Sequence, residues 1–196
     1  MPKSVDHDAY RSWLLDGSLD LAARRGYAGL RMREVAAALG VSTGTLYHYF
    51  RSKRDLWAQL VEHLTDRLVA EITDAIARAP TPRARLEALL ADVAARERWY
   101  AQYDRLCLDA LPGREAEDPW LMASTMDRIV AVLAPTLAVD HAAARFVFVF
   151  TLGLVVERDL DAGATPFAEQ AQLLLEWFDG LPSARRSGEA AAAGDG

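Results

Sequence analysis

The stretch from Met32 to Leu56, MREVAAALGVSTGTLYHYFRSKRDL, constrains the fold of this chain more than any other. It begins with Val35, Ala36 and Leu39 at the spacing that gives a helix one apolar side, which predicts a helix over 32–39. Gly40 follows, and glycine adopts without strain the left-handed backbone conformation that closes a helix. The stretch therefore opens with a short helix that ends in a tight turn.

A second short helix follows this turn. Ser42 is a favourable N-cap residue, although Thr45 stands where a capping box has Glu or Gln. At about 100° per residue, Leu46 and Phe50 fall on one side of the helix. The other side carries a hydroxyl, a bare backbone, a phenol and an imidazole, from Thr43, Gly44, Tyr47 and His48. One side suits packing, and the other suits entry into a DNA groove.

Helix-turn-helix spacing recurs in unrelated helical proteins, so the individual residues matter. The segment GVSTGTLYHYFRSKRDL closely resembles the recognition segment of the tetracycline-repressor (TetR) family of bacterial transcription regulators, in its glycine turn, its Leu-Tyr pair, Phe50 and the Ser-Lys before the next helix. The resemblance extends upstream through Ala23 to Tyr27 and covers residues 10 to 60. It departs at Ala22, where family members often carry a bulky aromatic residue, and this departure concerns the packing of the first helix.

The pattern and the resemblance together predict a double-stranded DNA operator as partner. Lys53 follows the second helix at a distance that lets it reach the DNA backbone. The residues predicted to contact DNA are Arg33, Ser42, Thr43, Gly44, Thr45, Tyr47, His48 and Lys53.

The formal net charge of −6 is divided unevenly along the chain. Residues 1–54 carry nine Lys or Arg and five Asp or Glu, a net charge of +4, and residues 55–196 carry thirteen and twenty-three, a net charge of −10. A basic head can engage phosphates while an acidic body keeps the rest of the molecule away from the duplex. The low overall pI therefore does not argue against a nucleic-acid partner.

Composition narrows the class of protein. A chain of 196 residues that is 52% hydrophobic can bury a core in one domain or two small ones. Its single cysteine, Cys107, excludes an internal disulfide and fits a reducing cytoplasm. The amino-terminal residues lack the apolar run of a signal peptide, and the longest apolar run, Phe146 to Val156, is shorter than the roughly 20 residues that span a bilayer. We expect a cytoplasmic protein with no membrane partner.

Apolar periodicity and proline positions predict an all-α fold. One long helix from Lys53 to Ala79 should join the head to the body, and prolines separate the helices that follow, with Pro135 closing the helix that begins after Pro119. The run FVFVFTLGLVV has the composition of a strand, but its flanks favour a helix over 141–161 and no second strand candidate exists.

We therefore predict three parts. A three-helix helix-turn-helix head covers 1–54, a helical ligand-binding and dimerisation body covers 55–182, and a disordered tail covers 183–196.

Motifs for catalysis are absent from the sequence. None of the four histidines has Glu three residues before it, and there is no HExxH, no GxSxG and no phosphate-cradling glycine loop. We expect no enzymatic activity, no cofactor and no metal.

The body contains many large, adaptable apolar side chains. For each one taken alone, core packing is the simpler explanation. In proteins of the resembled family the middle helices enclose a small-molecule pocket, and an aromatic and methionine lining favours a lipophilic or aromatic effector. The predicted lining is Trp99, Tyr103, Cys107, Met122, Met126, Phe146 and Phe150. Asp104 and Asp127 either meet a cationic group or are solvated.

Dimerisation is expected because one short recognition helix buries too little surface for tight operator binding, whereas a two-fold dimer reads both halves of a pseudo-palindrome. The resemblance implies that the last two long helices form the homodimer. We expect Leu174 to occupy an outward position on these helices. The alternative is that the internal core uses both helices.

The sequence thus predicts a ligand-responsive DNA-binding regulator, in the simplest case a repressor. A regulator without an effector, acting through a protein partner, is the first alternative, and a small sealed cavity in the body would favour it. The second alternative is a helical enzyme or binding protein with an incidental helix-turn-helix, which would show no salt-dependent DNA binding.

Overall fold

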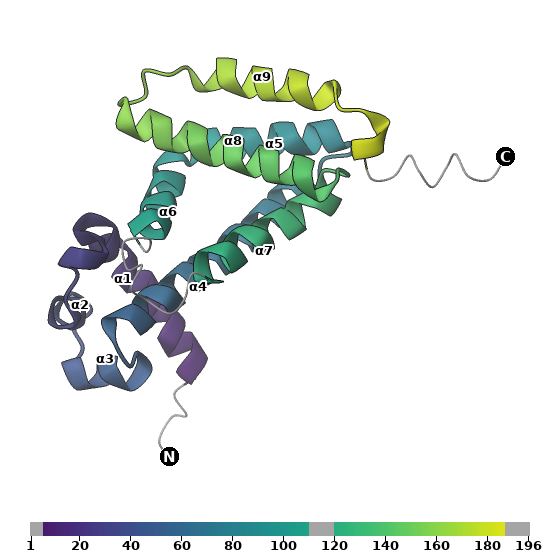
Figure 1. Ribbon diagram of the computed structural model, residues 1–196. Helices are drawn as coiled ribbons and strands as arrows, with labels where there is room; N and C mark the ends of the chain where they lie inside the picture. Colours follow the sequence, from purple (N-terminus) through teal and green to yellow (C-terminus); the bar gives the residue numbers. More distant parts are fainter. Residues whose placement is uncertain (1–5, 110–119, 187–196) are drawn as a thin grey trace. The chain divides into compact units, whose positions relative to one another are not determined.

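The computed structural model describes residues 6–109 and 120–186, and within these ranges the chain forms nine α-helices, one 3-10 helix and no strand (Figure 1). This confirms the predicted all-α class. Residues 110–119 and residues 187–196 of the predicted tail lie outside the described ranges. The helices are α1 (His7–Gly29), α2 (Met32–Ala38), α3 (Thr43–Tyr49), α4 (Lys53–Ala77), α5 (Pro82–Ala95), α6 (Glu97–Asp109), α7 (Trp120–Thr136), α8 (His141–Leu160) and α9 (Phe167–Asp179).

Contacts divide the chain into two compact units. The first comprises residues up to Asp66 and from Arg105 to Met122, and the second comprises Arg67 to Asp104 and the chain from Ala123 onward. The start of α4 belongs to the first unit because Trp57 packs there. Its ring meets the edge of Tyr27 with centroids 5.4 Å apart, and its indole N–H donates to the Leu106 carbonyl at 3.2 Å. The head therefore extends beyond residue 54, where the sequence predicts its end.

In the first unit, α1 begins and ends at residues with clear local signals. The Asp6 carboxylate caps its start by accepting from the backbone N–H groups of Asp8 and Ala9 at 3.1 Å. Gly26, with φ of +66°, interrupts the helical backbone at the predicted stop. Ala22 stands where the sequence departs from the pattern of the resembled family. It is fully buried, so this small side chain packs in the core.

The turn between α2 and α3 has the geometry that its sequence predicts. Gly40 has φ of +67°, its N–H donates to the Ala37 carbonyl at 3.2 Å, and the Val41 N–H donates to the Ala36 carbonyl at 3.0 Å. This pair of bonds is a Schellman motif, which satisfies the last carbonyls of α2. The two helices pack on each other, and α2 also packs on α1.

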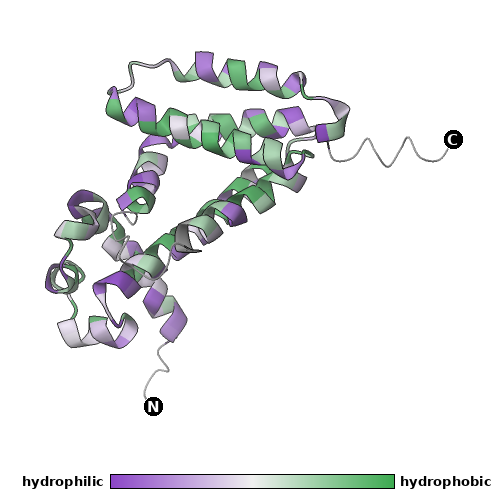
Figure 2. Cartoon of the chain, in the orientation of Figure 1, coloured by the Kyte–Doolittle hydropathy of each residue, from purple (hydrophilic) through white to green (hydrophobic). Residues whose placement is uncertain are grey.

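The second unit contains α5, α8 and α9, with α9 packed against both of the others. The strand-like run of α8 is helical, as its flanks predict, and its hydrophobic residues extend along much of the helix (Figure 2). The Asp140 carboxylate caps α8 by accepting from the Ala143 N–H at 2.7 Å. The helical prediction for 141–161 is confirmed.

Two details differ from the sequence-based expectation. Pro135 lies inside the last turn of α7 rather than beyond its end, where the missing N–H costs only one terminal hydrogen bond. The tail prediction is corrected for residues 183–186. Ser183–Arg185 form a 3-10 helix, and the Arg185 carbonyl accepts from the Asp140 N–H at 2.8 Å.

Candidate functional site

The two sides of α3 differ as predicted. Leu46 and Phe50 are fully buried, whereas Tyr47 is 49% exposed, and Gly44 and His48 are also exposed. Thr43 is half-buried at the first position of the helix. The exposed side therefore presents a phenol, an imidazole and bare backbone, which are groups suited to phosphates and base edges.

The start of α3 is fixed by two hydroxyl groups. The Ser42 Oγ accepts from the Thr45 N–H at 2.9 Å, which confirms Ser42 as the N-cap. Thr45 Oγ1 lies 2.8 Å from Ser42 Oγ, so the threonine closes the cap through its hydroxyl instead of a Glu carboxylate.

Lys53 has a partner inside the first unit. Its ammonium donates to the Tyr27 carbonyl at 2.8 Å and lies 4.5 Å from the centre of the Tyr27 ring. The Ala28 carbonyl lies at 3.5 Å. Two of the three N–H donors are thus directed at the end of α1.

Arginines supply the other cations near the helix-turn-helix. Arg33, which the sequence singles out, is exposed in the first turn of α2. Arg31 at the N-cap of α2 and Arg51 after α3 are exposed too, and sequence reasoning missed them. None of the three forms an ion pair with a residue in the described ranges. Arg31 and Arg51 each have an acidic residue at helical spacing, Glu34 and Asp55, so the sequence gives no simple signal that separates them from paired surface arginines.

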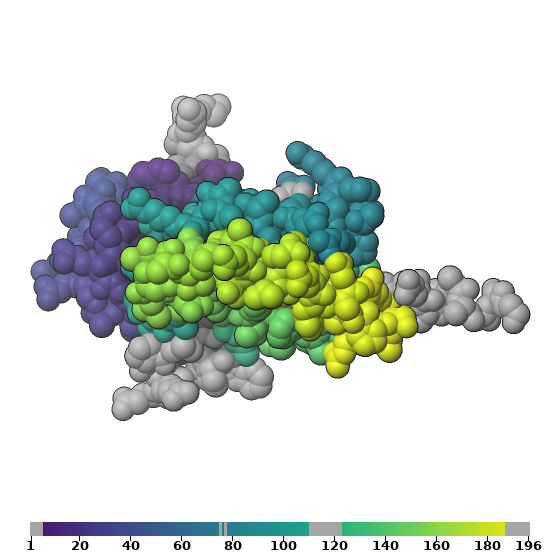
Figure 3. Space-filling model, turned by 90° about the horizontal axis from the view of Figure 1, so that it is seen from above, coloured from purple at the N-terminus to yellow at the C-terminus, as the bar shows by residue number. Residues whose placement is uncertain are grey.

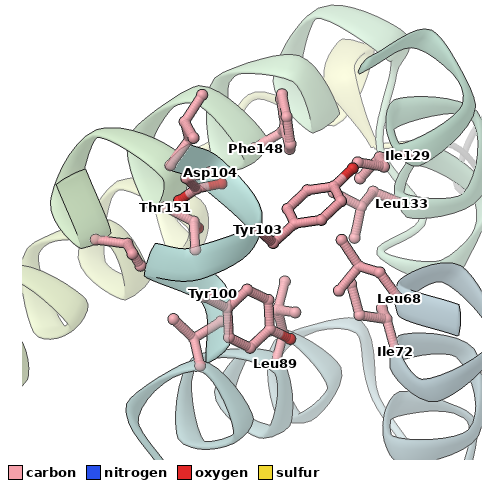
Figure 4. Close-up of a pocket in the computed structure, with 13 residues that line it drawn as sticks. Leu68, Ile72, Leu89, Tyr100, Tyr103, Asp104, Ile129, Leu133, Phe148 and Thr151 are labelled. Carbon is pink, nitrogen blue, oxygen red and sulfur yellow. The ribbon is translucent and has the colours of Figure 1, made fainter. Parts of the chain in front are cut away.

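A pocket lies among α4, α5, α6, α7 and α8 in the second unit (Figure 4). Its enclosed volume is about 40 Å³, and the space between the lining side chains reaches about 440 Å³ when the open mouth is included. Thirteen residues line the pocket, and they include Tyr103 from the lining that the sequence predicts. The lining is aliphatic and aromatic except for Thr151 and the buried carboxyl of Asp104.

The other predicted lining residues lie elsewhere. Trp99 stacks on Tyr103 with centroids 6.0 Å apart and does not line the cavity itself. Phe146 is exposed and packs on Trp177 with centroids 4.2 Å apart. Cys107 is buried, and Phe150 and Met126 are half-buried, all outside the lining. The side chain of Met122 lies outside what the structure describes.

Burial perturbs the one carboxyl in the pocket. Asp104 is only 7% exposed, and desolvation raises its pKa to about 7. Asp127, the other candidate from the sequence, instead forms an ion pair with Arg145 on the surface.

The last two helices carry exposed apolar side chains. Seen from above, the green-to-yellow residues of α8 and α9 lie on the surface of the second unit (Figure 3). Val149 of α8 and Leu173 of α9 are each 55% exposed. Leu174 is 1% exposed, so the expectation that it points outward is wrong. The exposed position is that of Leu173, the preceding residue.

Two further classes of site were searched for among the described residues. They contain no group of three His, Cys, Asp or Glu side chains able to hold a metal ion. None of their helices has the length and apolar character needed to cross a membrane.

Comparisons with known proteins agree with this geometry. The chain is 35% identical over 80 residues to the HTH-type transcriptional repressor KstR2 of Rhodococcus jostii, a match that covers 41% of this chain and 39% of KstR2. It spans less than half the length of the curated relatives it matches.

Solved structures extend the likeness to the whole fold. Escherichia coli NemR in its reduced form gives a TM-score of 0.71 at 19% identity, over 86% of this chain and 95% of NemR. The multidrug binding protein EbrR, complexed with imidazole, gives 0.68 at 20% identity, over 93% and 96%. At these identities the likeness concerns the fold alone.

The segment that contains α2 and α3 carries the family assignment. Residues 14–60 match the family described as bacterial regulatory proteins, tetR family. The segment 14–60 is therefore a tetR-family segment, and the chain as a whole shares its all-helical fold with NemR and EbrR.

Proposed function

We propose that the protein is a homodimeric repressor that binds a pseudo-palindromic DNA operator and is released by a small lipophilic effector. The observation that carries the proposal is α3, which is anchored by the buried Leu46 and Phe50 and exposes Tyr47 and His48. A helix held in this way can enter a major groove without rearranging its own core.

Phosphate binding is assigned to the groups around α3. Arg31, Arg33 and Arg51 are exposed and lack ion-pair partners in the described chain, so they can neutralise phosphates without first breaking a bond. Lys53 and the first turn of α3 add donors. Base preference is assigned to Thr43, Tyr47 and His48 because their side chains lie along one helix face.

Dimerisation is assigned to α8 and α9. Phe146, Val149 and Leu173 are large apolar side chains exposed on these two helices, and such side chains become favourable when a partner covers them. Two-fold symmetry would place a copy of α3 in each half of the operator.

Effector release is supported by the pocket in the second unit, whose lining is mostly apolar and whose mouth is open. The printed description of EbrR as a multidrug binding protein agrees with an effector in this fold. The enclosed volume of about 40 Å³ is small, however, and favours the second candidate, a regulator that acts through a protein partner without an effector. The open mouth makes the effector the better supported of the two.

The test is selection of bound fragments from a random DNA pool with the full chain. We expect enrichment of two half-sites in inverted orientation, centred about one helical turn apart or a multiple of it, and an affinity that falls steeply with salt. Failure to enrich any sequence, with no salt-dependent binding, would contradict the proposal. Enrichment with no small molecule that shifts the affinity would favour the second candidate.

A further inference from the structure

Asp104 places a carboxyl group inside an otherwise uncharged pocket. It is 7% exposed and is the one charged residue among the thirteen that line the cavity. In Figure 4 it lies near Thr151 of α8, while the rings of Tyr100 and Tyr103 extend from α6 into the space toward α4 and α7. A buried polar group without a partner is unfavourable, so this one requires an explanation.

The polar groups that share the pocket do not serve this carboxyl. The Thr151 hydroxyl donates to the Val147 carbonyl at 2.8 Å, and the Tyr100 hydroxyl donates to Asp92 at 2.7 Å. Asp104 makes no hydrogen bond or ion pair with any residue in the described ranges. It is an acceptor without a donor.

The arginines one helical turn from the lining are engaged elsewhere. Arg96 forms ion pairs with Glu71 and Asp92, and Arg158 of α8 pairs with Glu97 at the start of α6. The titratable groups that line the cavity with Asp104 are the two tyrosines. No cation of this chain therefore stabilises the carboxylate within the described lining.

Burial alone raises the pKa of Asp104 to about 7, so the group is about half ionised near neutral pH. A cation placed beside it would favour the ionised form.

We infer that the pocket takes a lipophilic amine, whose protonated nitrogen pairs with Asp104 while its hydrocarbon body contacts the apolar lining. The enclosed 40 Å³, room for about three waters, accepts an ammonium group but not an aromatic ring, which would lie in the mouth. This inference rests on the proposed function, since the amine would be the effector.

The experiment compares three probes with one skeleton and different charge: phenylbutylamine, phenylbutanol and phenylbutyrate. Their binding to the full chain is measured by calorimetry for the wild type, Asp104→Asn and Asp127→Asn. The last variant is the matched control, because Asp127 is a carboxylate on the surface and outside the lining. Circular dichroism establishes that each variant is folded.

We expect the wild type and Asp127→Asn to bind the amine at least tenfold more tightly than the alcohol, and the acid most weakly. In Asp104→Asn the amine should bind no better than the alcohol. A second measurement uses the wild type only, so it does not depend on a variant. Between pH 7 and pH 5 the amine should lose affinity by up to about tenfold per unit as Asp104 is protonated, while the alcohol should not.

An amine preference that persists in Asp104→Asn, or tighter binding of the alcohol or the acid, overturns the inference. Operator binding is measured on the same preparations. If DNA is bound but the amine is not preferred, the inference about the amine is wrong and the proposed DNA-binding function is still supported. If the amine binds through Asp104 but no DNA sequence is selected, the proposed function is wrong, and amine binding in the pocket is still supported.

Discussion

The ammonium of Lys53 is hydrogen-bonded to the backbone carbonyl of Tyr27 at 2.8 Å and lies over the ring of the same residue. These two residues join the start of α4 to the end of α1. Lys53 therefore has a structural role in the first unit in addition to its predicted role at a phosphate. The two roles have different experimental signatures.

Replacing Lys53 by Met keeps the aliphatic stem and removes the charge. We expect the unfolding midpoint to fall, by an amount equivalent to about 1 kcal/mol, because a charge-assisted bond at a partly exposed site is lost. DNA binding should weaken equally for all sequences, and the salt slope should fall by about one unit per subunit. An unchanged slope with a lower midpoint would show that Lys53 serves the fold alone.

Changes on the exposed side of α3 should act differently. Thr43→Ala or His48→Ala should change the base that is preferred at one position of each half-site, because the half-buried Thr43 and the exposed His48 share one side of a helix whose other side is anchored in the core. Selection from a random DNA pool measures this for each variant. A uniform loss of affinity with unchanged preference would assign both residues to the backbone.

Adjacent leucines on α9 give a matched pair for the dimer. Leu173→Arg, at a 55% exposed position, should give monomers that keep their helicity and bind operator weakly. Leu174→Arg, at a 1% exposed position, should instead unfold the second unit, because a charge in the core costs several kcal/mol. Sedimentation and circular dichroism separate the two results. A dimeric Leu173→Arg would place the interface elsewhere.

The head was predictable because its signals are local. Gly40 and Ser42 act on their own helix ends, and the structure has both in the expected roles. The pocket was less predictable because the phase of α8 is not encoded locally. FVFVFTLGLVV is apolar on all sides, so no polar face fixes which residues turn inward. Phe148, rather than Phe146 or Phe150, lines the cavity.

On α9, too, the sequence does not show which of several adjacent leucines turns inward. Leu173 and Leu174 are chemically identical, and only packing against α5 and α8 decides which of them is buried. The role of Asp104 was likewise open, since a lone carboxyl in a sequence gives no sign of its burial. The end of α6 belongs to the first unit, where Trp57 contacts Leu106, and periodicity does not reveal such a long-range contact.

Burial of Asp104 predicts a specific pH dependence of stability. The folded state raises the pKa from 3.8 to about 7, so it binds more protons than the unfolded state between these values, and stability falls as pH rises through this window. The Asp104→Asn variant lacks the ionisable carboxyl, so its stability should not fall with rising pH for this reason. Its free energy of unfolding should exceed that of the wild type by roughly 4 kcal/mol near pH 8 and should differ little near pH 4. Urea denaturation at both pH values checks this, and parallel profiles for the two proteins would refute it.

The last prediction concerns coupling between the pocket and α4. Tyr100, which lines the cavity, donates its hydroxyl to Asp92, and Asp92 is paired with Arg96. Arg96 is also paired with Glu71 of α4, the helix that begins at Lys53 in the first unit. A ligand that displaces the Tyr100 ring would disturb these bonds and so change the restraint on α4.

Glu71→Gln should therefore reduce the coupling between effector and operator while leaving each separate affinity nearly unchanged. A coupling of about 1 to 3 kcal/mol corresponds to a 5- to 150-fold change in affinity, and it must appear equally in both directions. Operator binding is measured with and without saturating phenylbutylamine, and amine binding with and without operator. Glu87→Gln, which removes an exposed pair with Arg83 on α5, is the control. Equal coupling in the wild type and in Glu71→Gln would show that the signal takes another route, because the ion pair between Arg96 and α4 would then be broken without effect.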